Sequence, residues 1–167
     1  MAPMYIYVQE LRKNHTSVAM RLRAVRTTMF CRGNEQIKSR ECVLPDEEGS
    51  YIHMHITGRN VSTVNNFVEG NVYCIKNFLV VAHFYIYKKC PRDYMLKFYS
   101  ETLVKEYKGC DFPRNMFQLQ PFECLKTVDA NVLVDVIGRV VKIYSPFDKM
   151  ISRRPSRLID FLIEDLK

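Results

Sequence analysis

The chain has 167 residues, enough for one complete domain and part of a second. Its hydrophobic fraction of 47% is typical of a globular core and excludes a disordered chain, and no run of 18 apolar residues could span a membrane. A formal net charge of +7 favours a polyanionic partner, either nucleic acid or an anionic surface.

The cysteine pattern bears on metal binding and on the cellular compartment. None of the six cysteines forms a Cys-x-x-Cys pair, and no histidine lies at zinc-ligand spacing from a cysteine pair. We therefore expect no metal site and no cofactor. The N-terminus lacks the basic-then-apolar pattern of a secretory signal, which predicts a reducing compartment where the thiols stay free.

The chain opens with a predicted lead-in at residues 1–16. In residues 18–24 apolar side chains alternate with Arg21 and Arg23. This alternation predicts a half-buried strand with a basic outer face. The two arginines either contact a ligand or are simply solvated.

The next stretch, residues 27–39, has no hydrophobic period. It contains Arg32, Gly33 and Lys38, and we interpret it as a polar, basic loop. A strand resumes at residues 42–44.

A hairpin is predicted around the acidic residues 46–48. Gly49 can adopt a positive φ there, and residues 52–57 then alternate as a strand. The alternation points His53 and His55 outward on one face. Outward histidines serve as metal ligands, as catalytic bases or as nucleic-acid contacts, or they are neutral surface residues. No third ligand lies nearby to favour a metal.

A short helix is predicted after the hairpin. Apolar residues recur at helical spacing between Asn60, a suitable N-cap, and Gly70, a suitable stop. Residues 73–81 are rich in β-branched and aromatic side chains and predict another strand.

The stretch 83–98 combines aromatic rings with cations, the residue types that hold single-stranded nucleic acid. The alternative is that its rings belong to a β core and its cations to a solvated edge. Its first half contains Phe84, Tyr85, Tyr87, Lys88, Lys89 and Arg92. A long strand is predicted over residues 93–107.

The remaining chain is predicted to be the start of a second copy of the unit that precedes it. Residues 108–128 hold prolines and a glycine and form an exit segment, with Phe117, Leu119 and Phe122 packing back on the core. A strand from residue 132, a second basic loop at 145–156 and a strand at 158–163 then repeat the order of the first strands.

Five strands with one short helix between the third and fourth match the OB-fold, an all-β, five-stranded Greek-key barrel. In that fold the second and third strands and two loops line the nucleic-acid groove. The predicted boundaries are a lead-in at 1–16, an OB domain at 17–112, a connector at 113–131 and an incomplete second OB domain at 132–167.

Several short runs resemble the first DNA-binding OB domain of the replication protein A large subunit, and above all its divergent plant copies. These runs are Val43 to Ile56, Phe67 to Phe78, Asp93 to Thr102, Pro121-Phe122 and Val134 to Gly138. Two positions depart from the family. Thr57 stands where a second stacking aromatic is expected, and Val18 stands where the family usually has Trp.

The resemblance implies sequence-tolerant binding of single-stranded DNA in the nucleus, in replication, repair or recombination. Other replication protein A-like subunits are possible partners, and no membrane or small-molecule substrate is expected. The candidate nucleic-acid contacts are Arg21, Arg23, Arg32, Lys38, His53, His55, Arg59, Tyr85, Tyr87, Lys88, Lys89 and Arg92.

Two further functions stay open at this point: a degenerate OB barrel that binds another protein, and an RNA-binding module. An enzyme is not expected, because the sequence shows no nucleophile–base pair, no Gly-rich phosphate loop and no carboxylate dyad.

Overall fold

The computed structural model describes residues 5–13, 15, 17–32, 36–58, 60–61, 67–109, 112–113 and 117–165, without the side chains of residues 30–38. The chain divides into two compact units. The first unit comprises Met1–Met116 and Asp129–Leu133, and the second comprises Phe117–Val128 and Val134–Lys167.

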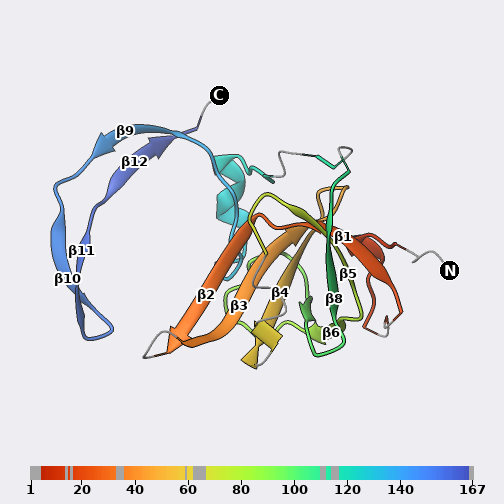
Figure 1. The fold of residues 1–167 in the computed structure, drawn as a ribbon. Helices are drawn as coiled ribbons and strands as arrows, with labels where there is room; N and C mark the ends of the chain where they lie inside the picture. The colour runs from red at the N-terminus through yellow and green to blue at the C-terminus, as the bar shows by residue number, and fades with distance from the viewer. Residues whose placement is uncertain are drawn as a thin grey trace. The chain divides into compact units, whose positions relative to one another are not determined.

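The regular secondary structure described for the first unit is mostly β-strand (Figure 1). Its described elements are the 3-10 helix η1 (Val8–Glu10) and the strands β1 (Ala19–Arg23), β2 (Arg26–Arg32), β3 (Gln36–Pro45), β4 (Tyr51–Thr57), β5 (Val72–Lys76), β6 (Leu79–Ala82), β7 (Tyr94–Lys97) and β8 (Leu103–Tyr107).

These strands form a three-stranded sheet in the order β1-β5-β8 and a five-stranded sheet in the order β2-β3-β4-β7-β6. In Figure 1 β2, β3 and β4 lie side by side. The pairing of β4 with β7 is parallel, and the other pairings of the two sheets are antiparallel. Only Ala24 and Val25 separate β1 from β2, so the chain passes directly from one sheet to the other.

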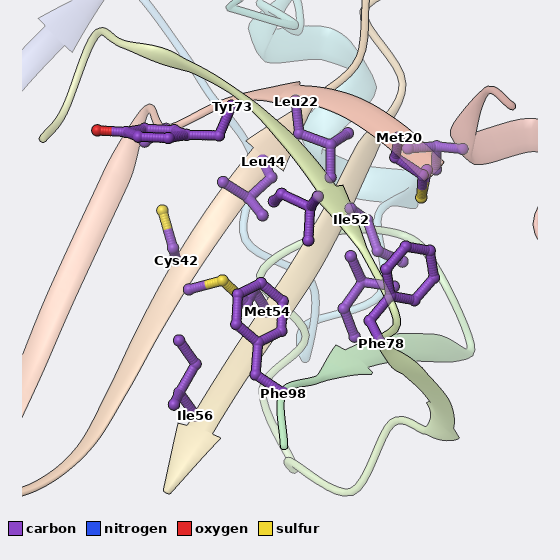
Figure 2. Packing of buried hydrophobic residues seen from close by; sticks show 14 of the residues in the cluster. Met20, Leu22, Cys42, Leu44, Ile52, Met54, Ile56, Tyr73, Phe78 and Phe98 are labelled. Carbon is purple, nitrogen blue, oxygen red and sulfur yellow. The ribbon is translucent and has the colours of Figure 1, made fainter. Parts of the chain in front are cut away.

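The hydrophobic core contains side chains from both sheets (Figure 2). Leu22 on β1, Leu44 on β3 and Met54 on β4 are fully buried. Burial of each such side chain contributes about 1.5–3 kcal/mol, so this cluster is the main source of stability. Figure 2 labels Met20, Leu22, Cys42, Leu44, Ile52, Met54, Ile56, Tyr73, Phe78 and Phe98.

The predicted acidic hairpin turn is confirmed between β3 and β4, and Asp46 organises it. The buried carboxylate accepts hydrogen bonds from the backbone N–H groups of Glu48 (3.0 Å) and Ser50 (2.9 Å). Its other oxygen accepts the N–H of Val8 at 2.7 Å. Gly49 has a φ of +80°, which glycine adopts without strain. One side chain therefore fixes the turn and the N-terminal segment.

The predicted strands at 73–81 and 93–107 are each interrupted in the structure. Asn77 has a φ of +56° and ends β5 before β6 begins. The hydroxyl of Thr102 donates to the carbonyl of Asn77 at 2.7 Å and accepts the N–H of Tyr99 at 3.0 Å. The same threonine thus fixes both interruptions.

The interpretation of residues 27–39 as a loop is wrong, since β2 and β3 occupy most of that range. The reason is that β2 lies at the edge of its sheet, where a strand needs no apolar alternation to form ladder hydrogen bonds. The predicted helix after Asn60 lies mostly outside the described residues, which omit 62–66.

The second unit contains the 3-10 helix η3 (Phe122–Thr127) and a paired set of short strands: β9 (Arg139–Ile143), β10 (Phe147–Ile151), β11 (Arg154–Leu158) and β12 (Phe161–Glu164). β10 pairs with β11, and β12 pairs with β9, both antiparallel. The predicted basic loop at 145–156 is therefore wrong. Many apolar side chains of these strands are exposed, including Ile143, Met150 and Phe161.

In the exit segment, Phe117 and Leu119 belong to the second unit and are 70% and 48% exposed. Within the described residues, no helix has the length and apolar character needed to cross a membrane. The described cysteines Cys42, Cys74, Cys90 and Cys124 are free thiols.

Candidate nucleic-acid interface

The candidate interface is the outer face of the five-stranded sheet, the face opposite the core. Strand register places its side chains in rows, because residues opposite one another on paired strands share a face. The upper row consists of Arg26, Val43, His53, Met95 and Val81. The lower row consists of Thr28, Glu41, His55, Lys97 and Leu79.

The segment 83–93, which we call the covering loop, connects β6 to β7 and lies against this face. Its ends are joined by a hydrogen bond of 2.7 Å from the N–H of His83 to the carbonyl of Asp93. The loop buries the middle of the upper row completely, so that His53 and Met95 are both 0% exposed. Lys97 and Thr57, in contrast, stay exposed. The outer face is therefore half covered and half open.

A single buried carboxylate, that of Glu41, holds the covering loop to the sheet. The Tyr85 hydroxyl donates a hydrogen bond to one oxygen of Glu41, and Lys89 Nζ lies 2.5 Å from the other. Nε2 of His53 lies 3.3 Å from the same carboxylate and Nδ1 of His55 lies 3.7 Å from it. Two residues of the loop and two of β4 thus meet at one residue of β3.

This network sets the charge of its members. Burial by itself would raise the pKa of Glu41, but the hydrogen bonds from Lys89 and Tyr85 outweigh it and hold this pKa below its ordinary value. Burial lowers the pKa of His53 to about 4, and it also lowers the pKa values of His55 and His83. The carboxylate is therefore charged at neutral pH while the three imidazoles are neutral.

The histidines differ from the sequence expectation. His53 and His55 were expected to point outward from β4, and they do lie on its outer side. Both are nevertheless buried, at 0% and 8% exposure, because the covering loop lies over them. The prediction that they lie at the surface is wrong, and the reason is tertiary: a loop 30 residues further along the chain covers them.

Arg21 and Arg23 lie on β1, which belongs to the three-stranded sheet and not to the outer face. Arg21 forms an ion pair of 2.6 Å with Glu47. Arg23 donates hydrogen bonds to the carbonyls of Gly70 and Phe112. Both arginines therefore hold the fold together, and the structure does not bring them to the histidines.

The covering loop carries the remaining predicted contacts. Tyr85 is anchored to Glu41, whereas Tyr87 is 63% exposed. Lys88 pairs with Asp93 at 2.7 Å, and Lys89 with Glu41. Arg92 is partly exposed. Arg59 and the side chains of Arg32 and Lys38 lie outside the described residues.

Four residues of the outer face and the covering loop are missing from the candidate contacts inferred from the sequence: Glu41, His83, Phe84 and Lys97. Phe84 belongs to the aromatic stretch that the sequence singled out. Its ring is 60% exposed and contacts the ring of His55. The sequence around Glu41 and Lys97 does not mark them as functional, because a single charged residue in a strand is usually solvated. Among the described residues, no three His, Cys, Asp or Glu side chains are grouped to hold a metal ion.

Comparison with solved structures gives the fold. A chain of a replication protein A heterotrimer bound to ssDNA matches with a TM-score of 0.61 and 19% identity, covering 96% of this chain and 39% of that one. This chain therefore spans well under half the length of that protein. The OB domain of Ta0387 from Thermoplasma acidophilum matches with a TM-score of 0.45 and 9% identity, covering 63% of this chain and 88% of that one.

The HINa domain of Ifi202, solved in complex with 20-bp dsDNA, matches with a TM-score of 0.46 and 13% identity, covering 91% of this chain and 71% of that one. A search of curated proteins finds no match. The fold is that of an OB domain similar to those of replication protein A. The family model "Domain of unknown function DUF223" matches residues 9–127, most of the chain, and the protein therefore belongs to the DUF223 family.

Proposed function

We propose that the first unit is a replication protein A-type OB domain that binds single-stranded DNA with little sequence preference. Its strands would form the five-stranded barrel of that fold, and no covalent bond would be made or broken. The observation that carries the proposal is the exposed ring of Tyr87 in the covering loop, directly before Lys88 in the chain. Exposed rings stack on bases, and nearby cations attract phosphates.

The charge of the chain supports this proposal. A net charge of +7 favours a polyanion, and several lysines of the first unit are exposed on its strands, among them Lys76, Lys97 and Lys105. The solved heterotrimer with the matching fold was bound to ssDNA. By this likeness we extend the proposal to a nuclear role in DNA replication, repair or recombination, alongside other replication protein A-like subunits.

The second unit fits the same proposal as the opening of another OB domain, with β9 to β12 as its first strands. Two-stranded pairs are marginally stable in water, and further strands would cover the exposed apolar side chains of the second unit. We retain the sequence-based boundaries of 17–112 and 132–167 for the two domains as part of this proposal.

The test is fluorescence anisotropy with a labelled dT oligomer at low and moderate salt. Wild type should bind, and affinity should fall with salt by roughly 0.7 log units per tenfold salt for each phosphate contact. Tyr87→Ala should weaken binding, since each base–aromatic stack contributes about 1–3 kcal/mol. Ile86→Ala is the matched control, because Ile86 is the neighbouring side chain, 78% exposed, and has no ring. If the dT oligomer does not bind even at low salt, the proposal is wrong.

A protein-binding module is the second candidate. Cations predicted to contact phosphates already have acidic partners, namely Arg21 with Glu47, Lys88 with Asp93 and Lys89 with Glu41. If the dT oligomer fails to bind while a protein partner co-purifies in stable stoichiometry, this candidate replaces the first. A U oligomer in the same assay decides between DNA and RNA.

A further inference from the structure

We propose that Glu41 positions the covering loop so that the exposed ring of Phe84 and the ammonium group of Lys97 form one nucleotide-binding subsite on the open half of the outer face. This inference rests on the proposed function and names the residues that would serve it. Glu41 and Tyr85 act in it as positioning residues, and the ligand is a single-stranded nucleic acid.

The geometry of Phe84 is the first support. Its ring meets the ring of His55 edge-on, with centroids 5.3 Å apart and an interplanar angle of 89°. It lies against Tyr85 with centroids 4.6 Å apart and an angle of 33°. The ring is nevertheless 60% exposed. Phe84 is therefore held at a fixed place by its neighbours while much of its surface stays open for a base.

Lys97 supplies a cation at the same place. It is opposite His55 in the parallel pairing of β4 with β7, and its charge contributes to the lowered pKa of His55. Phe84 contacts the same histidine, so the ring and the cation flank one residue. Thr57, two residues beyond His55 on the same face, is exposed as well. At this place the ring can stack on a base and the ammonium group can pair with its phosphate. The hydroxyl can form a hydrogen bond with the sugar or the edge of the base.

The network around Glu41 explains why the ring stays there. The covering loop carries exposed apolar side chains at Phe84, Ile86 and Tyr87. Because these side chains are exposed, other contacts must fix the position of the loop. Tyr85, between them, points inward and bonds both Glu41 and His55, while Lys89 bonds the same carboxylate. Because both anchors converge on one buried group, loss of that group should release the whole segment 83–89.

Binding measurements test the subsite. Phe84→Ala should weaken binding of a dT oligomer about tenfold, whereas Phe117→Ala, which removes an exposed ring of the second unit, should leave binding unchanged. Lys97→Ala should reduce the slope of log affinity against log salt by about 0.7. Lys105→Ala, on exposed strand β8, removes the same charge and should change the slope less.

Amide hydrogen exchange without ligand tests the positioning role. Tyr85→Phe removes only the hydroxyl and should speed exchange across residues 83–89 while weakening dT binding. Glu41→Gln keeps an acceptor for Tyr85 but removes the ion pair with Lys89, and it should give a smaller change in the same direction. Phe84→Ala should leave exchange near wild type, which separates the loss of a contact from the loss of position.

The possible results are distinct. If wild type binds and Tyr87→Ala weakens binding but Phe84→Ala and Lys97→Ala do not, the subsite is wrong and the proposed function stands. If Tyr85→Phe speeds exchange without weakening binding, the positioning role is wrong. If wild type does not bind any single strand at low salt, both the function and the subsite are overturned.

Discussion

The ammonium group of Lys89 lies 2.5 Å from the carboxylate of Glu41, whose side chain is only 4% exposed. A lysine that sequence reasoning assigned to a phosphate is thus paired with a carboxylate of the sheet. The pair ties the covering loop to β3. Removal of this ion pair should therefore lower the free energy of unfolding, whether or not a ligand is bound.

Lys89→Ala is expected to lower the free energy of unfolding by about 2 kcal/mol. Breaking a fully buried ion pair costs more, about 3–5 kcal/mol, but Lys89 is partly exposed and water screens the charge left behind. Urea unfolding followed by circular dichroism measures the change. Lys88→Ala is the matched control, since its partner Asp93 is exposed and the variant should unfold like wild type. Equal stability of the two variants would contradict this account of Glu41.

The buried histidines predict a stability that depends on pH. The pKa of His53 is about 4 in the folded chain against 6.5 for an ordinary histidine, because burial disfavours the imidazolium. Between these values the unfolded chain binds more protons, so stability is full above pH 6.5 and is lost as pH falls toward 4. From pH 7 to pH 5 this residue alone should remove about 2 kcal/mol.

The comparison of urea unfolding at pH 7 and pH 5 checks this dependence. His55 and His83 act in the same direction, since burial lowers their pKa values too. His53→Gln should be less stable at pH 7 and should show a shallower loss between the two pH values. A wild-type stability that is flat over this window would refute the buried, neutral state of His53.

Asp46→Ala is expected to cost about 3 kcal/mol, because three backbone N–H groups would lose their common acceptor at a buried site. Amide exchange at Val8 should quicken, since that residue bonds the same carboxylate. Asp46→Asn keeps one acceptor oxygen and should cost clearly less. If both variants unfold like wild type, the turn does not depend on this side chain.

The parts of the fold that could be predicted are those where burial imposes a pattern. In β1 and β4 apolar residues alternate because one face of each strand is in the core, and both strands follow from Leu22, Met54 and their neighbours. The edge strand β2 and the exposed strands β10 and β11 were missed because none of their described side chains is buried. Without a buried face, no apolar alternation is imposed on them, and their sequence resembles that of a polar loop.

The candidate interface was predictable only in part. Aromatic and basic residues in one short stretch pointed to the covering loop, and the loop does carry the exposed ring of Tyr87. The direction of each side chain was not predictable, because it depends on Glu41, which lies more than 40 residues earlier in the chain. Burial of His53 depends on the same distant contact.

Arg23 provides the sharpest contrast between the sequence expectation and the structure. It was a candidate phosphate contact, but its guanidinium donates to the carbonyls of Gly70 and Phe112, at 3.1 Å for the latter, and lies 5.2 Å from the centroid of the Phe112 ring. Arg23→Ala should therefore lower stability by about 1–2 kcal/mol. The salt dependence of dT binding should stay at the wild-type slope.

Arg23→Lys separates charge from hydrogen bonding at this position. It keeps the positive charge but cannot reproduce the two directed hydrogen bonds of the guanidinium, so it should be destabilised nearly as much as Arg23→Ala. Urea unfolding measures the stability, and anisotropy at several salt concentrations measures the slope. A slope that decreases in Arg23→Ala and recovers in Arg23→Lys would instead place Arg23 in contact with phosphate, and the interface would then extend onto the three-stranded sheet.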